Sequence, residues 1–110
     1  MAGEQNYSMM YLIQVLLPLE DETGTQFPSA RYERLAREFT EKFGGVTAYS
    51  RSPAQGRWKD GGDTHHDDIV VLEVMAQKID RAWWAALRTR LEEEFRQEEV
   101  IIRAQKMEQL

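Results

Sequence analysis

One carboxylate lies inside the most apolar stretch of this chain. Glu73 is the single charged residue of the run 69–76, IVVLEVMA. Burial among Val71, Met75 and a partner subunit would raise its pKa toward neutrality, which suits a general acid or base. The interpretation favoured over catalysis is structural, in which Glu73 pairs with an arginine of a neighbouring strand or subunit, or with Gln14. The residue type predicts a site here without deciding its chemistry.

A second candidate site follows the segment 52–56, SPAQG, where Arg57 precedes Trp58. A guanidinium beside an indole ring can hold an anionic or planar ligand. The alternative is that Trp58 closes one end of the hydrophobic core. If Glu73 acts as an acid or base, we expect Arg57 or Tyr49 to orient a substrate oxygen.

Acidic and imidazole side chains crowd a third stretch and comprise Asp60, Asp63, His65, His66, Asp67 and Asp68. These groups are suitable ligands for a divalent metal, with His65, His66 and Asp63 the first candidates. Their spacing matches no known ligand motif, and the residues 60–63, DGGD, are a strong turn signal. We therefore expect a solvated hairpin tip and no metal site. We also expect no cofactor, because the glycine pairs lack the spacing of a phosphate-binding loop.

Composition narrows the classes of partner. The 110 residues include 14 Lys and Arg, 19 Asp and Glu and no cysteine, with a net charge of −5. Nucleic-acid binding needs a dense basic patch, whereas here arginines alternate with glutamates, so no nucleic-acid partner is expected. The apolar run 9–19 is too short to span a bilayer and does not follow basic residues. No membrane association is expected, and we predict a cytoplasmic protein.

Periodicity divides the chain into six elements after a flexible terminus at residues 1–8. Apolar or alternating runs predict strands, and apolar residues at helical spacing predict helices. The expected strands are 10–19, 46–51, 69–76 and 100–105, and the expected helices are 29–43 and 81–96. Phe27 or Ser29 is the expected N-cap of the first helix, Gly44 its left-handed terminator and Asp80 the N-cap of the second.

The order β-α-β-β-α-β is typical of the ferredoxin-like α+β fold. We predict one domain over residues 1–110, with an antiparallel sheet of strand order 4-1-3-2 and both helices on one face. The face under the helices should hold Tyr11, Ile13, Val15, Leu17, Val70, Leu72, Val74 and Ala76.

The opposite face of the central strands is also apolar, although no element of the chain is predicted to cover it. Glu73 and Gln14 are its polar members. A large exposed apolar patch usually marks a partner surface. We therefore predict a homodimer that packs through this open face, with contacts from Leu12, Leu16, Ile69, Val71 and Met75.

Three short elements resemble a family of small bacterial proteins of unknown function. The residues 43–47, FGGVT, match its Phe-x-x-Gly-(Leu/Val)-Thr element; Gly56–Trp58 and 95–100, FRQEEV, match its Gly-x-Trp and Phe-x-Gln-Glu-x-Val elements. The resemblance covers about the last two-thirds of the chain. It implies a ferredoxin-like fold and supplies no activity. Members are often predicted to be lipoproteins or secreted, but this chain has no lipobox.

The function expected from these patterns is that of a non-enzymatic dimeric interaction or small-ligand-binding module. The alternative is a cofactor-independent enzyme of the dimeric αβ-barrel kind, which acts on a small hydrophobic or aromatic substrate with Glu73 as acid or base. An enzyme would need a concave, mostly apolar cavity that contains Glu73, so the position of this side chain separates the two hypotheses.

Overall fold

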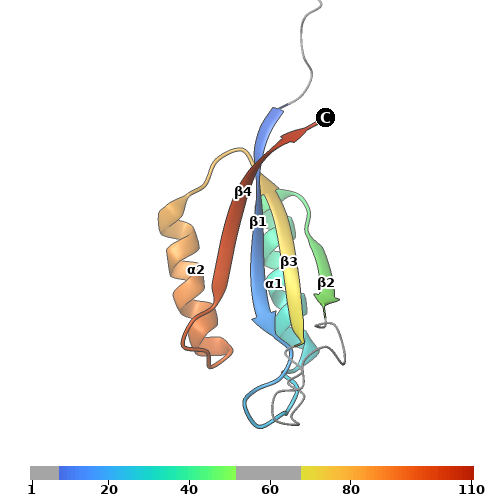
Figure 1. Cartoon of the computed structure of the whole chain (residues 1–110), viewed down its shortest axis with the longest axis vertical. Helices are drawn as coiled ribbons and strands as arrows, with labels where there is room; N and C mark the ends of the chain where they lie inside the picture. Colours follow the sequence, from blue (N-terminus) through green and yellow to red (C-terminus); the bar gives the residue numbers. More distant parts are fainter. Residues whose placement is uncertain (1–7, 52–67) are drawn as a thin grey trace, which may run out of the picture.

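Strands and helices follow one another in the predicted order (Figure 1). The computed structural model describes residues 8–51 and 68–110. The elements are β1 (Ser8–Pro18), α1 (Ser29–Phe43), β2 (Thr47–Arg51), β3 (Ile69–Ala76), α2 (Arg81–Glu94) and β4 (Ile101–Gln109). This arrangement confirms the predicted ferredoxin-like α+β fold.

The strands form one antiparallel sheet of order β2-β3-β1-β4, which is the predicted order read from the other edge. The two most apolar strands, β1 and β3, are its central pair and are aligned from Tyr11 opposite Ala76 to Pro18 opposite Ile69. Pro18 ends β1 one residue before the predicted boundary, because a proline cannot donate to a ladder. This register decides which polar residues of the open face become neighbours.

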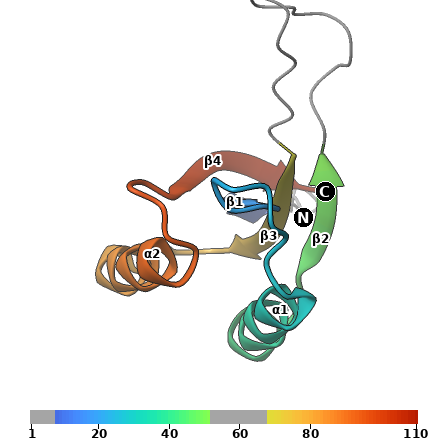
Figure 2. The same cartoon turned by 90° about the horizontal axis from the view of Figure 1, so that it is seen from below.

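Both helices cover the same face of the sheet (Figure 2). The core lies between these layers and includes Leu35 and Phe39 from α1 and Trp84, Leu87 and Leu91 from α2. The predicted inward residues of the central strands face this layer: Ile13, Val15, Leu17, Val70, Leu72 and Val74 are buried, and Tyr11 and Ala76 are partly buried against them.

Aromatic rings join the two helices to each other. Phe43 stacks on Trp84 with ring centroids 5.4 Å apart, and Trp83 meets Phe43 edge-to-face at 5.7 Å. Trp83 therefore lies between the helices. On the solvent side, Arg90 forms a 2.6 Å ion pair with Glu38.

The helix ends follow the predicted signals in part. Asp80 is the N-cap of α2 and accepts a hydrogen bond from the Trp83 amide at 3.1 Å, and Gly44 terminates α1 with φ 85°. The predicted N-cap of α1 was wrong. The helix begins at Ser29, so Pro28 is its N-cap. Proline has no side-chain acceptor and therefore makes no capping hydrogen bond.

Several predicted boundaries also differ from the structure, most of them by one or two residues. Helix α2 ends at Glu94 and not at Arg96, because Arg96 adopts a left-handed conformation with φ 52°. The outer ends of β1 and β4 pair with each other from Ser8 opposite Gln109, so both strands are longer than predicted. The end of β4 is mostly polar and has no apolar alternation, so the periodicity did not predict it as a strand.

Candidate functional site

The open face of the sheet carries one polar row between apolar rows. In the polar row, Thr47 of β2 lies opposite Glu73 of β3, then Gln14 of β1, then Arg103 of β4. One apolar row contains Tyr49, Val71, Leu16 and Ile101, and on the other side Met75 and Leu12 lie beside Gln105. The sheet thus places polar side chains from all four strands side by side.

A continuous chain of hydrogen bonds runs through this row. Arg103 Nε donates to Gln14 Oε1 at 2.7 Å, and Gln14 Nε2 donates to Glu73 Oε2 at 2.6 Å. The Tyr49 hydroxyl donates to the same Glu73 oxygen at 2.7 Å. The cation at one end and the anion near the other fix the orientation of the Gln14 amide, because its oxygen faces a donor and its nitrogen an acceptor. From here on, the name polar row is kept for the four hydrogen-bonded residues Arg103, Gln14, Glu73 and Tyr49, the last of which reaches in from the neighbouring row.

The carboxylate of Glu73 controls the ionisation of Tyr49. Its hydrogen bond with the phenol, together with loss of hydration and the negative charge, raises the pKa of Tyr49 above its usual value. If Tyr49 ionised, the hydrogen bond to Glu73 would be lost and the phenolate would be repelled by the negative charge of the carboxylate. Tyr49 is therefore held as a neutral donor while its side chain stays 37% exposed. The arrangement offers a ligand or a second chain a carboxylate, a phenol and a guanidinium on one surface.

The structure brings together Glu73, Gln14 and Tyr49, which the sequence had nominated for different reasons. It adds Arg103, which the sequence reasoning missed. Strand order places β4 beside β1, but no pattern in residues 100–105 fixes which residue of β4 meets Gln14. A signal was nevertheless present, because Arg103 is a cation within a segment predicted to be an edge strand beside that amide.

One member of the predicted partner surface is not available in this structure. Val71 is 1% exposed although it belongs to the open face. Its register partners, Leu16 on β1 and Tyr49 on β2, flank it on both sides. The other predicted contacts, Leu12, Leu16, Ile69 and Met75, are partly exposed. Ile101 of β4, which is 50% exposed, adds an apolar side chain that the prediction lacked.

No protein-family model matches this chain, and a search of curated proteins finds no match. Among solved structures, the chain is similar to a phage SAM lyase in complex with S-methyl-5′-thioadenosine, with a TM-score of 0.55 and 15% sequence identity. The alignment covers 88% of this chain and 81% of the lyase. The likeness is one of fold. It supports the ferredoxin-like topology and transfers no residue role to the polar row.

Glu73 is paired and lines neither of two cavities formed by described residues. The larger, of about 410 Å³, lies on the helix side of the sheet, and the other, of about 330 Å³, includes Leu16, Asp21 and Ile101. Neither of these two cavities is therefore the apolar cavity around Glu73 that an enzyme would need.

The remaining candidates fall outside the described residues. Arg57, Trp58, Asp63, His65 and His66 all belong to the segment 52–67. Within residues 8–51 and 68–110, no three histidine, aspartate or glutamate side chains converge as metal ligands would. The same part of the chain contains no helix long and apolar enough to cross a membrane.

Proposed function

We propose that this chain is a non-enzymatic interaction module that self-associates through the open face of its sheet. The observation that carries the proposal is the polar row and its apolar borders. Apolar side chains such as Ile101 supply area that is favourable to bury, and the polar row supplies orientation. A face of this composition fits a second copy of itself.

The charges of the row suit a two-fold symmetric partner. Arg103 lies at one end, and the Glu73 carboxylate lies two strands away. Among the described contacts, Arg103 uses its Nε and Glu73 its Oε2, which leaves the Nη groups of the arginine and the Oε1 oxygen for a partner. In an isologous interface the same patch meets itself in the reverse direction. The arginine of one copy would then face the glutamate of the other.

A charge-reversal series tests this arrangement. Sedimentation equilibrium at micromolar concentration should give a dimer for the wild-type chain, and Arg103→Glu and Glu73→Arg should each shift it toward monomer. The double variant restores opposite charges across the two-fold axis, and the Gln14 amide can turn over to suit them, so dimerisation should return. Arg37→Glu on the exposed side of α1 is the matched control. A monomeric wild-type chain would overturn the proposal.

A second candidate function is a cofactor-independent enzyme for a small hydrophobic or aromatic substrate, with Glu73 as acid or base. The observation in its favour is the 2.7 Å hydrogen bond between Glu73 and the partly exposed Tyr49, which could orient a substrate oxygen. The lyase neighbour gives a first substrate to try. Chromatography should then detect S-methyl-5′-thioadenosine released from SAM, and Glu73→Gln should abolish the release. No release would remove SAM from consideration for this second candidate.

A further inference from the structure

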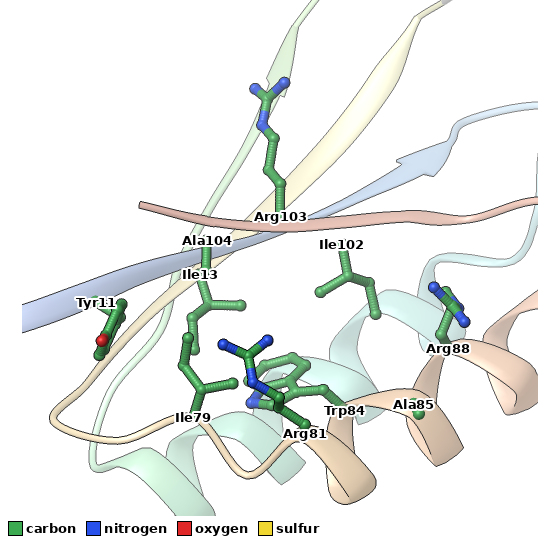
Figure 3. Close-up of a pocket in the computed structure, with 10 residues that line it drawn as sticks. All are labelled: Tyr11, Ile13, Ile79, Arg81, Trp84, Ala85, Arg88, Ile102, Arg103 and Ala104. Carbon is green, nitrogen blue, oxygen red and sulfur yellow. The ribbon is translucent and has the colours of Figure 1, made fainter. Parts of the chain in front are cut away.

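A cavity of about 410 Å³ lies between α2 and the strands β1 and β4, on the helix side of the sheet (Figure 3). It is separated from the polar row by the sheet itself. Figure 3 shows Arg103 on the far side of β4, pointing away from the cavity toward the open face. The volume falls within the range of small-molecule sites, about 300–1,000 Å³.

The inner wall of the cavity is apolar. Ile13 is 2% and Trp84 7% exposed, and Ile79 and Ile102 are partly buried beside them. These side chains come from β1, α2, the turn before α2 and β4, so the wall belongs to the rigid core. The accessible part of this wall lies mainly on Ile79 and Ile102, and an apolar ligand body can cover it without a change of fold.

The rim carries positive charge. Arg81 and Arg88 both line the cavity, and Figure 3 shows both reaching from α2 toward the strands. They are separated by about 10 Å, two turns of the helix. The lining residues within the described part of the chain include no aspartate or glutamate, although the whole sequence has a net charge of −5. Local charge is thus opposite in sign to that of the whole protein.

The two arginines differ in whether a carboxylate of the protein already lies beside their guanidinium group. Arg88 lies 4.0 Å from Glu92, whose carboxylate also accepts the Val100 amide at 3.1 Å. Arg81 has no ion pair among the described residues, and the neighbouring Asp80 caps the helix. Arg81 is also the first residue of α2, where the helix dipole favours an anion. It is the better anchor for a negatively charged group.

We propose that this cavity binds a small amphipathic organic anion. Its aromatic or aliphatic body packs on Ile79 and Ile102, above the buried Ile13 and Trp84, and its carboxylate is held by the Arg81 guanidinium. Arg88 adds longer-range attraction. A neutral analogue would leave the guanidinium without a partner, and a cationic analogue would meet two like charges. This site is independent of self-association through the open face.

Titration calorimetry with three probes of one shape tests the proposal. 1-Naphthoate should bind the full-length wild-type chain, whereas 1-naphthalenemethanol should bind at least ten-fold more weakly and 1-naphthylmethylamine should not bind. Arg81→Gln should weaken naphthoate roughly ten- to one-hundred-fold, the range expected for one charge-assisted hydrogen-bonded pair. Arg37→Gln removes the same charge from exposed α1 and should leave the affinity unchanged.

A steric variant separates this cavity from the rest of the surface. Ala104 lines the cavity from exposed β4, so Ala104→Phe should fill it and abolish naphthoate binding while thermal unfolding stays as in the wild type. Three results would each overturn the proposal: no binding of naphthoate, equal binding of naphthoate and the alcohol, or equal affinities for Arg81→Gln and Arg37→Gln. Unchanged binding by a folded Ala104→Phe would do the same.

Discussion

Tyr49 and Glu73 are joined diagonally across β2 and β3. The residue directly opposite Glu73 is Thr47, and Tyr49 lies opposite Val71, yet the Tyr49 hydroxyl reaches the Glu73 carboxylate at 2.7 Å. A long aromatic side chain can span such a diagonal on a sheet face. The ring of Tyr49 lies beside Val71 and connects the edge strand β2 to the polar row. The same contact therefore links packing on this face with its electrostatics.

The first prediction concerns the ionisation of Tyr49. Glu73→Gln should lower the pKa of Tyr49 toward its ordinary value, because the hydrogen bond to the carboxylate is the largest cause of the raised pKa. The ζ-carbon shift of ¹³C-labelled tyrosine, followed by NMR from pH 8 to pH 12, measures this directly, and Tyr49→Phe assigns the signal.

The control for this titration is Glu99→Gln, which removes a charge from an exposed position before β4. It should leave the Tyr49 titration where it is in the wild type. A Tyr49 curve that is the same in Glu73→Gln and in the wild type would contradict the contact on the open face.

The second prediction concerns stability at alkaline pH. Burial raises the pKa of Tyr32 to about 12, and its hydroxyl donates to the Pro18 carbonyl at 2.6 Å. A folded-state pKa above the unfolded value of about 10 means that this stabilisation is complete below pH 10. It is lost as the pH rises from 10 through 12. Tyr32→Phe should cost about 1 kcal/mol at pH 8, the value of one hydrogen bond.

Urea unfolding at intervals from pH 8 to pH 11.5 measures this effect as a difference between the wild type and Tyr32→Phe. Other groups titrate in both proteins and cancel. The difference in the free energy of unfolding should shrink above pH 10. Only the wild type has a hydroxyl at position 32, and its fold requires this hydroxyl to stay protonated. A constant difference over the whole interval would show that Tyr32 does not titrate as its burial requires.

Sequence patterns predicted the architecture because the core is strongly periodic. The alternation of Ile13, Val15 and Leu17 placed one face of β1 under the helices, and the spacing of Leu35 and Phe39 placed α1 upon it. Right-handed crossovers in a β-α-β-β-α-β chain favour the strand order 4-1-3-2, so these local signals predicted the sheet. They also isolated Glu73 as a charge in an apolar strand.

The site was only partly predictable, because its geometry depends on register. Gln14 and Glu73 could be assigned to one face, but the meeting of Gln14 with Arg103 follows from the pairing of β1 and β4, which no turn between consecutive strands specifies. The diagonal position of Tyr49 depends in the same way on the β2–β3 register. The cavity beside Arg81 combines β1, β4 and α2, and hence appears only after packing.

The third prediction uses the end of α2. Arg96 has φ 52°, and the amides of Arg96 and Gln97 turn back to the carbonyls of Glu93 and Glu92 at 3.2 and 2.9 Å. A side chain in this left-handed conformation costs about 1–2 kcal/mol, whereas glycine adopts it freely, as Gly44 does at the end of α1. Arg96→Gly should therefore raise the free energy of unfolding by about 1 kcal/mol.

Chemical denaturation of Arg96→Gly and Arg96→Ala separates backbone strain from loss of the charge. Both variants remove the guanidinium, but alanine keeps a Cβ and so keeps the strain. Only the glycine variant should be more stable than the wild type. The reverse exchange, Gly44→Ala, should destabilise by a similar amount because its Cβ meets no neighbouring atom and its cost is conformational. Equal stabilities of the two Arg96 variants would show that the left-handed turn after Phe95 carries no strain.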